Sequence, residues 1–569
     1  MGNPLFETIK VNVPGRTAFP MSHEVKFSCQ VGALVPFFCQ ECLPGDVWKM
    51  SSEIFLRMSP MLAPVMHRMD VYTHFFKVPM RLIYEDWETF ITGGPNGDGR
   101  KPDGSLAVFP QISQYKVDTT LAAPGQLCDY LGYPTWQYDS QGGEEPSSFQ
   151  GLKKNQVLNT INLSILPLRA YHLIWNEYYR DQNLSADISD NPYMQKGGIT
   201  SWSALQTATP WMFLIRYRAW EKDYFTSALP WAQRSTDTEN LRLPLSGTAP
   251  IDFVSNTVNA TVVRTTPGSS TTTNNVTGSS VLGGSLGSSV SLRIGEAPVT
   301  IDNSDSLRVN LSKASGSTIN ELRRLYAIQR FAERNAVGGA RYIEQILAHF
   351  GVVSSDARLQ RPEYLGGGKS PVIISEVLQQ SQTTPSDSPG GASSLGDMAG
   401  RAISVGKSHS FATKCEEHCI IMGIMSVIPR SSYQQGISRF LTKFDKFDYA
   451  WPSFAHLGEQ EVFNYEIFPR ATSDDTKTFG YQSRYAEYKF INSHVHGKFK
   501  TDLNYWHLGR VFDAAPKLNP AFITFDPREV DRIFAVQTKD ATDEHCYVQI
   551  FNKVQAVRPL PKYGTPEGL

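Results

Sequence analysis

The sequence is poor in cysteine and has almost no net charge, and both absences exclude classes of protein. Its 569 residues include only seven cysteines, an odd and small number that disfavours a secreted fold held together by disulfides. The 54 basic and 55 acidic residues leave a formal net charge of −1, so the chain as a whole does not attract a polyanion or an acidic membrane. Any nucleic-acid contact therefore has to be local, and synthesis in a reducing cytoplasm is expected.

Long apolar runs and targeting signals are also missing. The longest apolar run, Cys419–Pro429, is about half of the ~20 residues that a helix needs to cross a bilayer. Residues 1–10 lack the apolar core of a signal peptide, and Phe6 stands where a myristoylation signal requires serine or threonine. We therefore expect no membrane insertion, no secretion signal and no lipid anchor.

Aromatic and apolar residues are abundant, and their pattern favours short strands. Apolar residues make up 41% of the chain, enough to bury a core, and 43 glycines and 35 prolines punctuate it as in folds whose strands are joined by turns and long loops. The first two apolar runs, 25–38 and 71–78, are expected to pair with each other in the core. Later strands are expected at 420–428, 461–468, 484–499, 532–536 and 547–554.

Helices and loops are predicted between these two groups of strands. Helical spacing of apolar residues appears at 80–92, 168–180 and 341–350, the last ending at Gly351. Thr318 and Glu321 form a capping box that should begin a further helix ending at Gly338. Residues 93–145 are predicted to be a long surface excursion, and residues 381–400 a loop. The order of strands, helices and strands predicts a β-sandwich with large insertions.

One long segment has no charged residue. Between Thr265 and Leu292 the chain consists of Ser, Thr, Gly and Asn with one Pro and a few aliphatic residues. Such a composition cannot bury enough surface to form a core of its own. The segment is either a flexible linker or, as we favour, an exposed insertion that folds only against neighbouring molecules.

Several short motifs resemble catalytic or ligand sites, but their contexts argue against them. Gly283–Gly287 matches the G-x-S-x-G pattern without the strand and helix that the pattern requires, and Gly366–Ser370 resembles a phosphate loop whose first glycine is replaced by Glu363. We predict no catalytic residue, no cofactor and no metal site. Two sets of potential metal ligands are more simply explained as buried or incidental residues: Cys39, Cys42, Cys415, His418 and Cys419, and the pair His494 and His496.

A local mixture of cations and aromatic residues is the best candidate for nucleic-acid binding. Cations neutralise phosphates and aromatic rings stack on unpaired bases, so the combination suits a single strand. The simpler alternative is that the aromatic residues face a sheet core and the cations face solvent. The candidate residues are Arg484, Lys489, Lys498, Lys500, Tyr505, Trp506 and Arg510.

Several longer blocks, in order along almost the whole chain, resemble the major capsid proteins of microviruses, especially their gokushovirus-like branch. The number and order of these blocks make the resemblance far more specific than any short motif above. They are LPGD at 43–46, FFKVPMRLIYEDW at 75–87, LRAYHLIWNEYYRDQNL at 168–184, DYFTSALPW at 223–231, the segment 338–368, YAWPSFAHLGEQEV at 449–462 and FGYQSRYAEY at 479–488.

The resemblance implies a structural protein and no enzyme. It implies a viral jelly roll of eight antiparallel strands with long helical and loop insertions, and a T=1 icosahedral shell of sixty copies around circular single-stranded DNA. Residues 1–235 and 318–569 would supply the strands, and residues 236–317 would form a protrusion at the three-fold axes that contacts a host surface receptor.

The resemblance also implies partners and a location. Partners would be further copies of the chain, the packaged DNA, a DNA-pilot protein and a small basic DNA-binding protein. The chain would be part of the virion, assembled in the cytoplasm of a host bacterium.

A secreted carbohydrate-binding β-sandwich with exposed aromatic residues is the alternative function. The lack of a signal peptide and the ordered blocks both count against it. An enzyme ranks third, and a turnover that is lost on changing Cys415 or Cys419 would support it.

Overall fold

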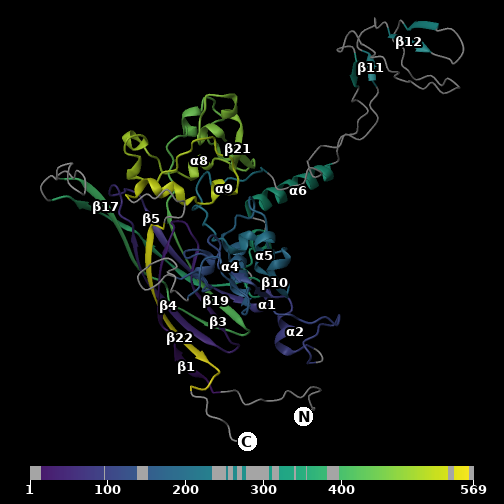
Figure 1. The fold of residues 1–569 in the computed structure, drawn as a ribbon. Coiled ribbons are helices and arrows are strands. Elements are labelled where there is room, and N and C mark those ends of the chain that lie inside the picture. Colours follow the sequence, from purple (N-terminus) through teal and green to yellow (C-terminus); the bar gives the residue numbers. More distant parts are fainter. Residues whose placement is uncertain are drawn as a thin grey trace, which may run out of the picture. The chain divides into compact units, whose positions relative to one another are not determined.

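The structure, a computed structural model, describes most of the chain. The described residues are 15–94, 97–137, 151–232, 251–253, 260–264, 272–276, 307–309, 319–338, 341–353, 355–380, 396–535 and 544–562. By their internal contacts they form two units, the first of Met1–Ala232 with Asn335–Leu569 and the second of Gln233–Arg334. The first unit contains both large sheets (Figure 1).

Two antiparallel sheets form the framework of the first unit. The seven-stranded sheet runs in the order β1 (Thr17–Pro20), β22 (Cys546–Arg558), β4 (Val47–Met58), β17 (Met398–Lys407) and β16 (Ile373–Leu378), with β2 (His23–Cys29) also paired to β22 and β18 (Phe411–Lys414) to β4. The four-stranded sheet runs β15 (Glu363–Pro371), β5 (Met69–Pro79), β19 (Cys419–Pro429) and β3 (Val35–Cys42). Buried residues of both sheets belong to one hydrophobic cluster, as in a β-sandwich.

The burial patterns show how the two sheets differ. Along β22 buried and exposed residues alternate, so the seven-stranded sheet has one face in the core and one in solvent. Every residue of β19 is buried. Its alternate side chains enter two clusters: Ile421 and Met425 lie in the core between the sheets, and Ile420 and Met422 lie in a second core on the other side. The four-stranded sheet is therefore the middle layer.

The second core lies beneath short helices gathered beside the four-stranded sheet (Figure 1). Its principal helix, α4 (Leu166–Ile174), buries Leu168 and Tyr171 completely and continues as one π-helical segment, Trp175–Tyr179. The other helices of this layer are α1 (Met80–Ile83), α2 (Trp87–Thr92), α3 (Leu127–Tyr130) and α5 (Trp202–Ala208). Five short strands accompany them: β6 (Gln111–Ser113), β7 (Tyr115–Lys116), β8 (Val157–Leu158), β9 (Leu163–Ser164) and β10 (Ile199–Ser201).

Residues 430–535 form a third region of the first unit, built mostly of short helical turns. It contains the hairpin of β20 (Glu459–Phe463) and β21 (Thr478–Ser483) and the helices α8 (Ala486–Lys489) and α9 (Pro520–Ile523). A separate hydrophobic cluster that includes Phe225 and Phe479 holds it together. Helix α7 (Tyr342–Phe350) also belongs to the first unit.

The second unit is described only in part. Its strands β11 (Ile251–Phe253) and β14 (Leu307–Val309) pair with each other, as do β12 (Ala260–Arg264) and β13 (Thr272–Val276). Helix α6 (Ile319–Gly338) begins in this unit. Apart from these strands, the expected insertion at 236–317 lies outside the described residues, and so do Thr318 of the capping box and the motif at 283–287. The expected division at 235 and 317 stays a prediction.

Most of the long predicted elements are confirmed. The runs at 71–78, 420–428 and 547–554 are strands, and the segments 168–180 and 341–350 are helical. Gly351 ends α7 with a left-handed φ of +68°, a conformation that glycine adopts without strain. Among the described helices, none is long and apolar enough to cross a membrane.

The predicted pairing of 25–38 with 71–78 is wrong. Residues 25–38 divide between β2 and β3, which lie in different sheets, and β19 lies between β3 and β5. The surface excursion at 93–145 is also wrong in part, because Ile112, Tyr115 and Leu127 are completely buried in the second core. In both cases a partner distant in sequence decides the arrangement.

Three predicted strands near the C-terminus also differ from the structure. The strand at 461–468 ends at Phe463. Residues 484–499 contain α8 and a 3-10 turn, because Tyr485, with a φ of +61°, turns the chain after β21. The strand predicted at 532–536 is replaced by a 3-10 helix over residues 527–533. This helix forms because the Asp526 side chain accepts a hydrogen bond from the Arg528 N–H and Pro527 fixes the first helical φ.

A buried ion pair fixes the point where the chain crosses between the sheets. Asp46 is 0% exposed and lies in the turn from β3 to β4. Its Oδ2 accepts hydrogen bonds from the Leu43 N–H at 3.0 Å and from Trp48 Nε1 at 3.3 Å, and lies 3.2 Å from Nε of Arg558. Because Arg558 ends β22, this single carboxylate connects the crossing turn to the last strand.

Replacing Asp46 with Asn should destabilise the fold strongly. The amide keeps the size of the side chain but leaves Arg558, whose side chain is 17% exposed, without its counter-charge. We expect the free energy of unfolding to fall by about 3 kcal/mol, measured by urea unfolding followed through tryptophan fluorescence. The control is Asp103→Asn at an exposed loop carboxylate that accepts a hydrogen bond from the Ser105 N–H. Equal losses in the two variants would contradict the role of Asp46.

Candidate functional site

Exposed apolar side chains are concentrated on one part of the 430–535 region. Phe444 is 90% exposed and Ile491 93%. Soluble monomers rarely expose large apolar patches, and such patches mark contacts with other proteins. We call this set the aromatic surface: Phe440, Leu441, Phe444, Phe447, Tyr449, Trp451, Leu457, Tyr488, Phe490 and Ile491.

Lys443 joins the two chain segments of the aromatic surface. Its side chain is 4% exposed and its Nζ lies 2.9 Å from a carboxylate oxygen of Glu487. The same Nζ lies 4.1 Å from the ring centre of Tyr488 and 5.9 Å from that of Tyr449. Burial alone would raise the pKa of Glu487, but hydrogen bonds from Gln460 and Lys443 outweigh it and lower that pKa. The ion pair of Lys443 with Glu487 therefore holds the exposed rings of Tyr488 and Tyr449 in place.

Two further parts of the first unit expose apolar side chains. On α7 and the residues after it, Tyr342 is 70% exposed, Phe350 79% and Val353 80%. In the hairpin of β16 and β17, Ile373 and Val405 are also largely exposed. The described chain thus offers several broad apolar faces, as a subunit that contacts several neighbours requires.

The structure divides the predicted nucleic-acid residues into two groups. Lys489, Lys498 and Lys500 are exposed and Arg484 is half-buried, with its guanidinium 5.0 Å from the ring centre of Tyr485. Tyr505 and Trp506 are half-buried, with ring centres 6.5 Å apart. These residues remain candidates for contact with a nucleic acid.

Arg510 has a different environment from the other predicted cations. It is 2% exposed, and its Nη2 donates a hydrogen bond to the Phe522 carbonyl at 2.9 Å. Its guanidinium also lies 4.4 Å from the centre of the Phe522 ring, and its Nε lies 3.8 Å from Glu529. In this position Arg510 stabilises the interior of the region and does not reach a phosphate in solvent.

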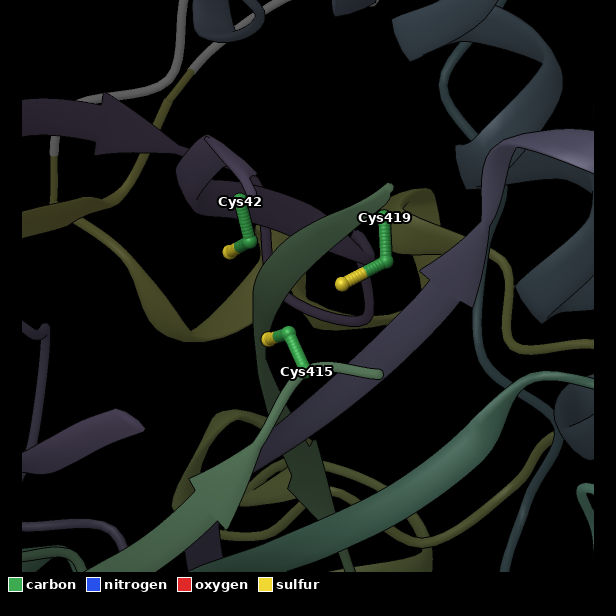
Figure 2. Close-up of side chains that lie close together, drawn as sticks. All are labelled: Cys42, Cys415 and Cys419. Atoms are coloured by element: carbon green, nitrogen blue, oxygen red, sulfur yellow. The ribbon is translucent and has the colours of Figure 1, made fainter. Parts of the chain in front are cut away.

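The structure brings together three of the five residues considered as zinc ligands. The sulfurs of Cys42, Cys415 and Cys419 lie within 4.8 Å of one another, and all three residues are buried (Figure 2). Cys39 and His418 are not in this cluster. The sequence named these residues as possible ligands but favoured incidental thiols, because Cys42 and Cys419 meet only through the pairing of β3 with β19, in which they are direct partners.

Hydrogen bonds within the cluster separate the pKa values of the three cysteines. Bonds from Cys419 and Cys42 lower the pKa of Cys415 to about 4, against the opposing effect of burial, and the charges of Lys77 and Arg558 add to this lowering. Burial raises the pKa of Cys42, and the hydrogen bond with Cys415 raises that of Cys419. Of the three thiols, Cys415 therefore has the lowest pKa, and the Cys42 thiol donates a hydrogen bond to the Gln40 carbonyl at 3.7 Å.

The other motif residues with described positions do not form sites. Gly366–Ser370 lies within β15, and Lys369 pairs with Asp70 at 3.0 Å, so the segment is a strand and not a phosphate loop. The ring centres of His494 and His496 are 6.0 Å apart. Neither histidine belongs to the cluster of three potential ligands found among the described residues.

Known proteins similar to this chain are capsid proteins. The family model described as Capsid protein (F protein) matches residues 8–567. Capsid protein VP1 of Chlamydia phage 1 is 33% identical over 605 residues, which cover 97% of this chain and 95% of that protein. The Capsid protein VP1 of Bdellovibrio phage phiMH2K is 32% identical, with 97% and 95% covered, and that of Spiroplasma virus 4 is 28% identical, with 99% and 97% covered.

These matches extend over nearly the whole chain, as do the sequence blocks that resemble microvirus capsid proteins. The family is structural and not catalytic, which agrees with a fold whose most prominent surfaces are broad apolar faces. The chain therefore belongs to the capsid protein (F protein) family of the microviruses, and it is a capsid protein of a bacteriophage virion.

Proposed function

We propose that sixty copies of this chain assemble into a T=1 icosahedral shell around a circular single-stranded DNA genome, inside the host bacterial cytoplasm. The two antiparallel sheets support the further proposal that the core is a viral jelly roll of eight strands extended by additional ones. A near-neutral subunit lacks the charge to balance a genome. A small basic DNA-binding protein, and a DNA-pilot protein, are therefore proposed as partners.

The aromatic surface is the observation that carries the assembly proposal. Its most exposed side chains, Phe444 and Ile491, are almost entirely in solvent in the single chain. Burying an apolar side chain of this size contributes about 1.5–3 kcal/mol, and a closed shell repeats each contact many times. Aromatic anchors surrounded by polar residues such as Lys489 are the usual centre of a protein–protein contact.

Electron microscopy and light scattering of the recombinant chain test assembly. We expect closed particles of about sixty subunits. The double variant Phe444→Ser with Ile491→Ser should reduce particle yield at least tenfold, because it removes two apolar anchors from each contact. The control is Leu106→Ser, which changes a 56% exposed residue outside the aromatic surface. Normal assembly of the double variant would contradict the role of this surface, and a wild-type monomer that binds glycans would favour a carbohydrate-binding protein instead.

We also propose that Lys489, Lys498 and Lys500, with Arg484 and the aromatic rings of Tyr505 and Trp506, contact the packaged DNA. The exposure of the three lysines supports this proposal. Lys498 and Lys500 are two residues apart and both exposed, so their charges can neutralise neighbouring phosphates.

Changing two of these lysines should weaken DNA binding and reduce its dependence on salt concentration. Affinity for single-stranded DNA decreases with salt, and the slope of log affinity against log salt is therefore negative. For Lys498→Gln with Lys500→Gln we expect this slope to become less negative by about 1.4. The control, Lys26→Gln with Lys407→Gln, removes two exposed lysines that pair with Glu24 and Glu53 on the seven-stranded sheet. Binding of oligonucleotides by fluorescence anisotropy across a salt series measures both. An unchanged slope in the first variant would reject the proposed contact.

The insertion at 236–317 is proposed as the protrusion that contacts a host surface receptor. It follows the DYFTSALPW block, and all of it falls within the second compact unit, Gln233–Arg334. A compact unit separate from the sheets can vary without disturbing the core.

Deleting residues 236–317 tests the receptor proposal. Particles carrying a short Gly-Ser connection in its place should still assemble but lose attachment to host cells, measured as unadsorbed particles after incubation. A deletion confined to residues 381–395, within the segment that the sequence predicts to be a loop, serves as the control. Attachment that survives the loss of 236–317 would rule out this role for the insertion.

A further inference from the structure

The three clustered cysteines lie where the chain passes between the two sheets. Cys42 ends β3, and Cys419 begins β19, so both belong to the four-stranded sheet. Cys415 follows β18, which pairs with β4 in the seven-stranded sheet. Figure 2 shows the three side chains near one another on these separate segments, with the Cys419 sulfur directed toward the other two cysteines.

The backbone around the cluster is held in place by the crossing turn. The Cys415 N–H donates a hydrogen bond to the Asp46 carbonyl at 2.8 Å, and the Gly45 N–H donates one to the Cys415 carbonyl at 2.7 Å. Register pairing of Cys42 with Cys419 fixes the other two residues. The three sulfurs are therefore positioned by main-chain structure before any ligand binds, which lowers the cost of ligand binding.

The other nearby residues that could bind a metal ion do not belong to the cluster. His418 precedes Cys419 and packs its ring 5.5 Å from that of Trp87, on the side of the second core. Cys39, which also packs against the second core, is outside the cluster. The buried carboxylate of Asp46 is already bound by Arg558. Among the described residues, three thiols thus form the complete set of ligands.

We propose that Cys42, Cys415 and Cys419 bind one thiophilic metal ion of the Zn²⁺ or Cu(I) class. Thiolates are the preferred ligands of these ions. Metal–sulfur bonds are about 2.3 Å long, so three sulfurs around one ion lie about 4 Å apart. The sulfurs here lie within 4.8 Å of one another and need only a small inward movement.

The charges around the cluster suit such an ion. Three thiolates with one monovalent or divalent cation carry a net negative charge, and the cations Lys77 and Arg558 act electrostatically on Cys415. The side chains of both are mostly buried, at 10% and 17% exposure, and each also pairs with a carboxylate, Lys77 with Glu363 at 2.9 Å and Arg558 with Asp46 at 3.2 Å. Protons displaced from the thiols on binding pass to the solvent buffer.

The bound ion would act as a structural link between the sheets. It would connect β3 and β19 of one sheet to the end of β18 in the other, next to the turn that Asp46 holds. Because the cysteines are buried, the ion would enter as the subunit folds and would leave slowly from the folded chain. This inference does not depend on the size of the shell or on DNA binding.

Metal content of the purified full-length chain tests the proposal. The chain is expressed in medium supplemented with zinc or with copper, purified with a phosphine reductant, and analysed for metal by mass spectrometry. We expect about one equivalent of Zn²⁺ or Cu(I) per chain, and X-ray absorption at the metal edge should show three sulfur ligands, alone for Cu(I) and with one oxygen ligand such as water for four-coordinate Zn²⁺. The two media distinguish the two ions.

Variants distinguish a built site from incidental binding. Cys415→Ser and Cys42→Ser should each lower the metal content at least tenfold, whereas Cys128→Ser, at a buried cysteine outside the cluster, should retain it. Metal below a tenth of an equivalent in the wild-type chain from both media would overturn the proposal, and this result does not depend on whether the variants fold. In a second sample purified without reductant, an intact mass lower by two hydrogen atoms that returns to the expected mass after reduction would show a disulfide instead and would also overturn the proposal.

Discussion

The buried carboxylate of Asp46 is the constraint on which the rest of the fold depends. A buried charge must be paired, and here Arg558, the last residue of β22, is the partner of Asp46 Oδ2, which also accepts hydrogen bonds from Leu43 and Trp48. The pair holds the turn from β3 to β4, and through it the passage of the chain from one sheet to the other. Main-chain hydrogen bonds from the same turn position Cys415, so the cysteine cluster depends on this constraint as well.

The layered arrangement explains how one chain can have both a rigid interior and extensive contact surfaces. The four-stranded sheet is covered on both sides, and β19 is buried along its whole length, so the interior is closely packed within the single chain. The aromatic surface lies in a different region, on short turns supported by the ion pair of Lys443 with Glu487. Separating stability from contact in this way suits a capsid subunit, whose surfaces must meet several copies of itself without changing the core.

The prediction of local elements succeeded where the signal was contained in a short segment. The helices at 168–180 and 341–350 and the strand at 547–554 have clear periodicity, the strand at 420–428 is a continuous apolar run, and Gly351 marks a helix end because glycine adopts a left-handed φ easily. The strands predicted at 484–499 and 532–536 failed, because the left-handed Tyr485 and the cap formed by Asp526 and Pro527 override an apolar pattern. The prediction of a surface excursion at 93–145 failed for another reason. A composition typical of loops does not show whether the segment will be buried against a distant sheet.

By itself the sequence determined the mainly β character, the lack of a whole-chain field for a polyanion, and, through its long ordered blocks, the family of phage capsid proteins. Composition, periodicity and similarity are properties of the chain read in order, so no coordinates are needed for them. The tertiary structure alone decided which strands pair, that Arg510 is buried while Lys498 is exposed, and that Cys42 meets Cys415 and Cys419. These features depend on contacts between residues hundreds of positions apart, which the hydrophobic core and the buried ion pair bring together only when the whole chain folds.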